Sequence, residues 1–376
     1  EFPRGIPVVI NSGQAAGCTG IVTKYAKGFR NEIDIEVKTC RVMREDVARQ
    51  VKKITMDFES HQSYWRVQDV ADSLGISFET VLSILGSIII KSDQSVNSKS
   101  VYAEKFDVGL NLVKSKYNML VPELIIFDEK NKVRGDRNVK HFFLSPEAKD
   151  LVDDYFKNCK AVVNALEERL KTRDPEPLNA KGVFKGSEDP NLDLLKVYIW
   201  ILKTENANLI QSNQSSKVLP REGIRLIEQY MKNTKAERAK GPTKQAEFGA
   251  YNPNNLYPHY EDYWIPPTFV EQPAWHFVGD RVVNLKTVGY NFAPFGAQGT
   301  VVGILGNKYE NDVLEVKVEV LFDEPFIGGS NLGGRCSWAR GAIVNFSDIY
   351  NVKWAKSIIL RSKDNFDLNY WDGSFR

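Results

Sequence analysis

Basic and aromatic side chains occur together in two short stretches, one near each end of the chain. Small β-barrels use such residues in two ways: cations neutralise RNA phosphates while a ring stacks on a base, or the same groups grip another protein domain. The residues leave both interpretations open, so we treat them as candidates for docking or RNA contact. They are Lys24, Lys27 and Arg30 in the first stretch, and Arg335, Trp338 and Arg340 in the second.

A third group of cations lies in the loop 128–140, where Lys130, Lys132 and Arg134 are close together. Acidic neighbours dilute their charge. An ordinary solvated loop therefore explains this group as well as nucleic-acid contact does.

The glycine-rich tract 328–334 could be mistaken for a phosphate loop. It lacks the Gly-Lys-Ser/Thr ending, and no helix follows it to offer an N-terminus to an anion. We interpret it as a β-hairpin packed against a neighbour, in which Gly333 leaves the backbone bare for close approach. Arg335 would then make charge-assisted bonds to a carboxylate across that contact.

No set of residues has the spacing of a catalytic or metal site. The four histidines and four cysteines are scattered, with no CxxC pair. A two-metal nuclease needs several carboxylates that converge on one point, and the sequence indicates no such cluster. We therefore predict no catalytic residue, metal ligand or cofactor within this chain.

The composition is that of an ordinary folded protein, because 42% of the 376 residues are hydrophobic and 26% are charged. That length favours two or three domains. With a net charge of only +2, any contact with a polyanion must come from local patches. No apolar run approaches the roughly 18 residues that span a bilayer, so we expect no membrane contact. The scattered cysteines indicate a reducing compartment.

The elements that must position these residues are strands at both ends and helices between. Residues 17–22 and 33–37, and again 296–304 and 314–321, follow the pattern of glycine turns and alternating β-branched strands. Between them, the stripe at 67–74, Gly75 and a Ser77-capped helix predict a helix-turn-helix. The fold class we predict is multi-domain α+β, with two small SH3- or KOW-like β-barrels flanking a winged-helix domain whose wing is the loop 128–140.

The second helix of this helix-turn-helix carries no basic residue and one acidic residue, Glu79. A helix that reads base edges in the major groove must present Arg, Lys, Asn or Gln. We therefore expect a structural or protein-docking role for it. Further helices are expected at 45–59, from Ser145 through 166, at 192–202 and at 221–231.

These patterns set the domain boundaries. Residues 1–44 form the first part of a KOW-like barrel, and 45–232 form a winged helix with extra helices. Residues 233–272 form an extended linker, first basic and then rich in aromatic residues and proline, which returns to the KOW-like domain. Residues 273–376 form an SH3-like barrel.

Three motifs of the last barrel suggest a family. They are G-D-R-V-V at 279–283, G-A-Q-G-T-V-V-G-I at 296–304 and F-I-G-G-S-N-L-G-G-R at 326–335. Together they resemble the last folded domain of the large cytoplasmic 5′→3′ exoribonucleases of the Xrn family. The start of the chain looks like that family's KOW-like domain, and V-A-D-S-L-G-I-S at 70–77 resembles its inserted winged helix.

The resemblance implies a cytoplasmic enzyme that degrades 5′-monophosphorylated RNA processively, with magnesium, in mRNA decay. Its nuclease would lie N-terminal to the domains seen here, which would flank and brace it. None of the nuclease motifs occurs in this sequence, so no catalytic residue is carried over. Because the chain begins at Glu1 rather than methionine, we expect it to be a piece of a longer protein. Expected partners are the nuclease region of the same protein, single-stranded RNA and decay-factor proteins.

Two functions from different classes remain open. The first is the non-catalytic scaffold of a 5′→3′ exoribonuclease. The second is an independent KOW- or SH3-like module of a transcription or translation factor, which binds RNA or protein. The sequence immediately before Glu1 would distinguish them.

Overall fold

The chain divides into two compact units, Glu1–Ser60 with Lys217–Arg376, and His61–Ser216. The computed structural model describes residues 2–11, 15–27, 33–41, 45–93, 104–114, 119–127, 142–173, 176–204, 211–213, 216–239, 248–259, 276–286, 293–306 and 316–351. The expected boundaries at 44/45 and 232/233 differ from this division, since residues 45–60 and 217–232 belong to the first unit. The physical reason is that the helices in those segments bury their apolar faces there.

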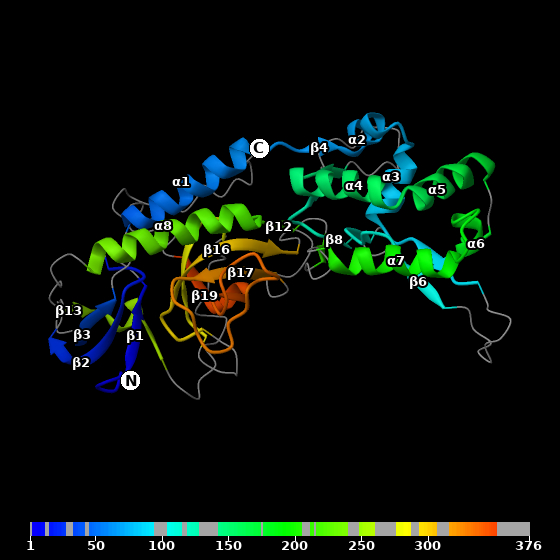
Figure 1. Ribbon diagram of the computed structural model, residues 1–376. Coiled ribbons are helices and arrows are strands. Elements are labelled where there is room, and N and C mark those ends of the chain that lie inside the picture. Colours follow the sequence, from blue (N-terminus) through cyan, green and yellow to red (C-terminus); the bar gives the residue numbers. More distant parts are fainter. Residues whose placement is uncertain are drawn as a thin grey trace, which may run out of the picture. The chain divides into compact units, whose positions relative to one another are not determined.

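The first unit contains a five-stranded antiparallel sheet built from two distant parts of the chain (Figure 1). Its order is β13-β3-β2-β1-β14. The strands are β1 (Pro7–Ile10), β2 (Thr19–Lys27), β3 (Ile33–Arg41), β13 (Phe248–Tyr251) and β14 (Leu256–Pro258), with a 3-10 turn, η4 (Pro253–Asn255), before β14. Segment 248–258 therefore supplies both edge strands. Over the described strands the sheet is open, and its closure as a KOW-like barrel stays a prediction.

A second antiparallel sheet in the same unit follows the order β18-β17-β16-β15-β19, and β12 pairs with β16 outside this path. The strands are β12 (Lys217–Val218), β15 (Arg281–Asn284), β16 (Gln298–Leu305), β17 (Lys317–Phe322), β18 (Gly341–Asn345) and β19 (Ile349–Asn351), with a 3-10 turn, η7 (Phe346–Asp348), before β19. The register shifts between Val301 and Gly303, which marks a bulge that bends β16. Val301, Val318, Val320 and Phe322 are buried in its core.

Two long helices, α1 (Glu45–His61) and α8 (Arg221–Ala239), cover one side of the second sheet (Figure 1). Val51 of α1 and Ile227 of α8 share a buried cluster with Leu321 of β17. Helix α8 runs eight residues past the end predicted at 231. The basic first part of the linker expected at 233–272 therefore begins as helix and not as extended chain, because Lys, Ala, Glu and Arg at 235–239 are strong helix formers.

The second unit contains the predicted helix-turn-helix, which is confirmed as α2 (Val67–Leu74) and α3 (Phe78–Leu85). Gly75 ends α2 with a φ of 67°, a left-handed conformation that glycine adopts without steric cost. The side chain of Ser77 caps α3 by accepting a hydrogen bond from the backbone N–H of Thr80. These local signals are why the sequence located the turn.

A three-stranded sheet accompanies these helices, with the order β4-β10-β9. Its strands are β4 (Trp65–Arg66), β9 (Ile125–Phe127) and β10 (Phe142–Leu144). Antiparallel β9 and β10 enclose the loop predicted as the wing, which lies outside the described residues. The winged-helix assignment therefore stays a prediction.

The remaining elements of the second unit surround one hydrophobic core. They are β5 (Ile89–Lys91), β6 (Lys105–Asp107), β7 (Val113–Lys114), β8 (Met119–Leu120), β11 (Ser212–Asn213), α4 (Pro146–Asn158), α5 (Lys160–Thr172), α6 (Ala180–Val183) and α7 (Pro190–Lys203). The single helix predicted from Ser145 through 166 is two helices, because the backbone leaves the helical conformation at Cys159 (φ −114°, ψ 31°).

The mixed α+β class is confirmed. No helix within the described ranges is long and apolar enough to cross a membrane.

Candidate docking and RNA-contact surface

Arg335 lies in the interior of the first unit, which corrects the expectation that it faces an external partner. The residue is 5% exposed. Its Nε donates to the carbonyl of Leu332 at 3.0 Å, its Nη1 donates to the carbonyl of Leu219 at 3.3 Å, and its Nη2 donates to Oε1 of Glu319. The carboxylate partner predicted for Arg335 thus belongs to the same second sheet, on β17.

Glu319 is more deeply buried still, with its side chain 1% exposed. Its Oε2 has no hydrogen-bond partner among the described residues. A Cβ placed on Gly303 would lie 2.2 Å from that oxygen, so glycine is what leaves room for the carboxylate between β16 and β17. Arg335 thus links Leu219, in the segment before α8, to Glu319 of the sheet, and its role is structural.

The glycine-rich tract packs against its own unit. Ser330 and Gly341 form an isolated antiparallel bridge, and a Cβ on Gly329 would lie 2.3 Å from the carbonyl oxygen of Ala339. The carbonyl of Gly334 accepts a hydrogen bond from Nε of Arg221, the first residue of α8, at 3.0 Å. Gly333 has a φ of 71°. A glycine at position 333 therefore allows the left-handed backbone conformation that the chain adopts there.

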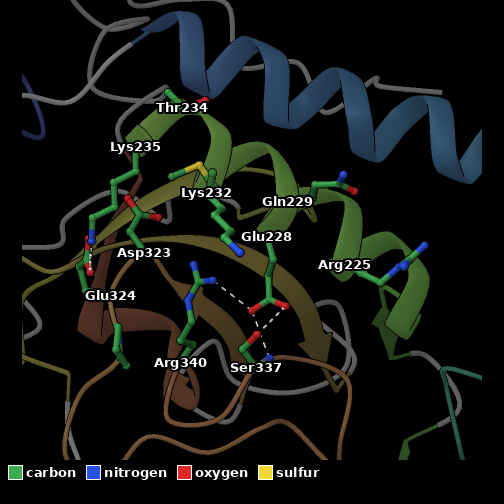
Figure 2. Close-up of a pocket in the computed structure, with 12 residues that line it drawn as sticks. Arg225, Glu228, Gln229, Lys232, Thr234, Lys235, Asp323, Glu324, Ser337 and Arg340 are labelled. Atoms are coloured by element: carbon green, nitrogen blue, oxygen red, sulfur yellow. Dashed lines mark hydrogen bonds and ion pairs between the residues drawn. The ribbon is translucent and has the colours of Figure 1, made fainter. Parts of the chain in front are cut away.

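Arg340 lines a groove of about 600 Å³ between α8 and the loops of the second sheet (Figure 2). Its Nη1 lies 3.1 Å from Oε1 of Glu228, and its Nε donates to the carbonyl of Phe322 at 2.9 Å. The backbone N–H and hydroxyl of Ser337 also donate to Glu228, each at 3.1 Å. Figure 2 shows both side chains directed at this one carboxylate of α8.

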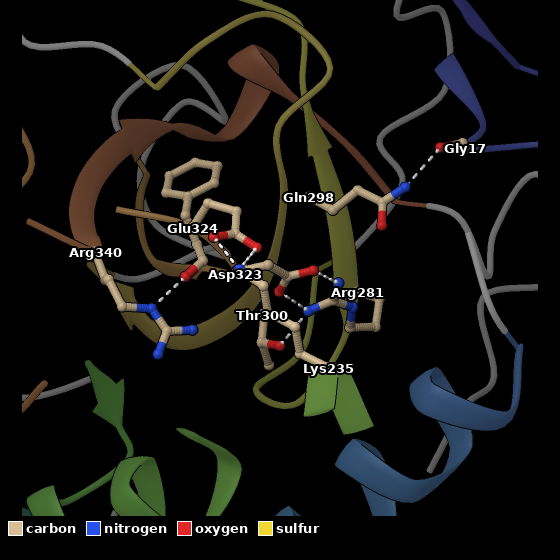
Figure 3. Close-up of polar contacts among 9 residues, drawn as sticks. Gly17, Lys235, Arg281, Gln298, Thr300, Asp323, Glu324 and Arg340 are labelled. Atoms are coloured by element: carbon tan, nitrogen blue, oxygen red, sulfur yellow. Dashed lines mark hydrogen bonds and ion pairs between the residues drawn. The ribbon is translucent and has the colours of Figure 1, made fainter. Parts of the chain in front are cut away.

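The rest of the groove carries both signs of charge. Lys235 of α8 pairs with Glu324 at 2.7 Å, and Lys232 is exposed beside it. Asp323 also lines the groove, where the buried guanidinium of Arg281 holds both its oxygens (Figure 3). Because three carboxylates stand among the cations, the groove favours a polar protein surface over a phosphate backbone.

Trp338 directly follows Ser337, which lines this groove, and is 76% exposed. Backbone pairing of the Phe326 N–H with the Ala339 carbonyl at 2.9 Å places its loop beside Ile327, which is 99% exposed. Ala339 has a φ of 62°, which is uncommon for a residue with a side chain. The backbone strain and the exposed ring together make Trp338 the strongest docking candidate of the original set.

The basic residues of the first sheet are at the end of the β2–β3 hairpin. Lys24 is 67% exposed and lies 3.5 Å from Glu36 of β3. Lys27 is exposed at the last position of β2, and Tyr25 between them is 56% exposed. Arg30 lies outside the described residues, as do Lys130, Lys132 and Arg134 of the 128–140 loop. Of these two predicted groups, the structure therefore describes only Lys24 and Lys27.

Within the described part of the chain, no group of three or more His, Cys, Asp or Glu residues could hold a metal ion. We therefore assign no magnesium ligand there. Cys336 near the groove does not offer a reactive thiolate, because burial, aided by the charge of Glu228, raises its pKa to about 12.

Comparison with known families gives a match over most of the chain. The family described as the exoribonuclease Xrn1 D2/D3 domain matches residues 1–247, and the Xrn1 SH3-like domain matches residues 274–351. The chain belongs to the Xrn1 exoribonuclease family. The second sheet is accordingly the SH3-like domain, which was predicted as the barrel at 273–376, and the Xrn resemblance of the sequence is confirmed.

Two curated relatives in the family carry the name 5′-3′ exoribonuclease 1. The human protein is 27% identical over 286 residues, which is 75% of this chain and 15% of its own length. The Schizosaccharomyces pombe protein is 27% identical over 300 residues, or 79% of this chain and 19% of its own length. The chain thus spans less than one fifth of the length of either relative.

Sequence reasoning missed the α8 side of the groove. Glu228, Lys232 and Lys235 lie at positions i, i+4 and i+7 of one helix, so they share one face. A predicted helix that continued to residue 239 would have shown these three residues as a charged stripe. The pair of buried Arg281 and partly exposed Asp323 left no signal, because its members are 42 residues apart.

Proposed function

We propose that this chain is the non-catalytic scaffold region of a 5′→3′ exoribonuclease that degrades 5′-monophosphorylated RNA in cytoplasmic mRNA decay. The observation that carries the proposal is the consecutive match to the Xrn1 D2/D3 and SH3-like domains in a chain that spans only 15–19% of its relatives. The nuclease region would lie elsewhere in the same polypeptide, and this region braces it.

The packing of the first unit supports a bracing role. Lys52 of α1 donates to the carbonyl of Val278 at 2.7 Å and pairs with Asp280 at 3.2 Å. The hydroxyl of Tyr350 in the SH3-like domain donates to the backbone carbonyl of Asn11, next to β1. Helix, first sheet and SH3-like domain are therefore tied at several points. A rigid body of this kind holds a partner in one geometry at low entropic cost.

Trp338 and its neighbour Ile327 provide the contact through which the region would dock. Binding energy at protein interfaces concentrates in a few large side chains, above all Trp, Tyr and Arg, surrounded by polar groups that exclude water. Arg340, two residues after Trp338 in the sequence, pairs with Glu228 and would supply part of that polar surround.

The second candidate function is direct RNA or protein binding by the region as an independent module. It is favoured by the exposed Tyr25 near the end of β2, which shares its face of the strand with the exposed Lys27. A ring beside a cation can stack on a base while the lysine meets a phosphate.

The proposal is tested in the longer polypeptide to which the chain belongs. Trp338→Ala and Trp338→Phe versions are assayed for degradation of 5′-monophosphorylated RNA, together with Tyr25→Ala. A scaffold that docks through Trp338 loses activity in Trp338→Ala, with partial recovery in Trp338→Phe, and its RNA affinity is unchanged. Loss of RNA affinity in Tyr25→Ala with full activity in Trp338→Ala would favour the module instead.

A further inference from the structure

Helix α7 (Pro190–Lys203) of the second unit carries two sets of large apolar side chains, one buried and one exposed. Its inner face places Leu194 and Ile201 in the hydrophobic core, where they are 0% and 8% exposed. Its outer face carries a second set of large apolar side chains, which are 39–55% exposed. They are Leu192, Leu195, Ile199 and Leu202. A contiguous stripe of exposed large apolar side chains on a helix marks an interaction site.

The spacing of the outer face identifies the kind of element that would cover it. The four residues are separated by three, four and three positions, which is the a and d pattern of a helix–helix seam. Leu192 and Ile199 take the a positions, and Leu195 and Leu202 take the d positions. Side chains at this spacing interlock with those of a second helix whose apolar residues repeat in the same way.

The residues beside the exposed apolar stripe of α7 indicate the charge that the covering helix should carry. Lys196 and Lys203 both stand at the e position, one heptad apart, and both are exposed. Lys196 pairs with Asp193 at 2.7 Å, but the lysine side chain is 66% exposed, so this pair contributes little and Lys196 can exchange partners. Charges at the e and g positions select the partner and its orientation. Two lysines there select acidic side chains.

We propose that α7 is a docking site for an amphipathic helix that has a leucine- or isoleucine-rich seam and acidic flanking residues. This site goes beyond the proposed scaffold role and does not depend on it. A second copy of α7 is a poor occupant, because it brings no acid to the lysines and an antiparallel pair would place them opposite each other.

The test uses the 376-residue chain and a synthetic peptide of about three heptads, with Leu and Ile at a and d and Glu at e and g. Repulsion between its glutamates keeps the peptide from pairing with itself. Fluorescence anisotropy is expected to show binding that falls about tenfold or more in Leu195→Glu and Leu202→Glu. Leu170→Glu, which changes a leucine 42% exposed on α5, is the matched control and should bind as the wild type does.

Charge selection is tested with the double variant Lys196→Glu, Lys203→Glu and a peptide that carries Lys in place of Glu. The double variant should lose the acidic peptide and gain the basic one. The proposal is overturned if neither peptide binds the wild type, or if both bind it equally. Sedimentation that shows a wild-type dimer and a monomeric Leu202→Glu variant would overturn it in favour of a second copy. Circular dichroism confirms that each variant is folded.

Discussion

Arg335 and Glu319 form an ion pair in the interior of the SH3-like domain, with side chains 4% and 1% exposed. Removing one partner leaves the other as an uncompensated buried charge, which costs about 3–5 kcal/mol. We therefore predict that Arg335→Ala lowers the free energy of unfolding by that amount, measured by urea denaturation. This result would agree with the buried position of Arg335 and not with the sequence-based expectation that Arg335 bonds a carboxylate across a docking contact.

The matched variant replaces both members with methionine. Apolar residues of similar volume often substitute for a buried ion pair without loss of stability. Arg335→Met with Glu319→Met should therefore be more stable than Arg335→Ala alone. If Arg335→Ala unfolds like the wild type and only loses a binding partner, the structural role is refuted.

We expect the loss of stability on adding a side chain at Gly333 to depend on the backbone conformation of this residue and not on the size of the side chain. Its φ of 71° lies in the left-handed region, which costs an ordinary residue about 1–2 kcal/mol. Asparagine populates this region more readily than alanine does. We predict that Gly333→Ala destabilises the chain by this amount and that Gly333→Asn does so less. Equal thermal stability of wild type and Gly333→Ala would contradict the backbone account.

His276 makes the stability of the first unit depend on pH. Burial lowers its pKa from 6.5 to about 4, although the nearby carbonyl of Phe346 and Asp280 partly oppose this shift. Between these values the unfolded chain takes up a proton that the folded chain does not. The contribution of neutral His276 to the free energy of unfolding is therefore fully present above pH 6.5. It falls by about 3 kcal/mol as the pH drops towards 4.

Urea denaturation of wild type and His276→Gln at pH 7.5 and pH 5 measures this effect. The variant should lose much of the difference between the two pH values. His61→Gln, which changes an exposed histidine of α1, should keep the wild-type difference. An identical pH dependence in His276→Gln and the wild type would show that His276 is not the titrating group.

Local signals explain what the sequence predicted well. Gly75 and Ser77 located the helix-turn-helix, because a left-handed C-cap and an N-cap are decided within a few residues. The family motifs of the SH3-like domain were likewise contiguous. The position of Arg335 could not be predicted from neighbouring residues. Its carboxylate partner lies 16 residues away on β17, and its burial depends on how β12 and the Gly-rich tract fold over it. The groove was missed for the same reason, because α8 supplies one wall of it partly from the helix expected at 221–231 and partly from the segment beyond it, which was expected to be an extended linker.

The proposed scaffold function is tested most directly by adding this chain to the nuclease-bearing remainder of its polypeptide. The remainder is incubated with 5′-monophosphorylated RNA and magnesium, alone and with increasing amounts of the 376-residue chain, and nucleotide release from the 5′ end is followed. We predict that the chain alone releases none, that the remainder alone is weakly active, and that the chain restores its activity in a saturable way that Trp338→Ala weakens. Nucleotide release by the chain alone, or full activity of the remainder without it, would contradict the account.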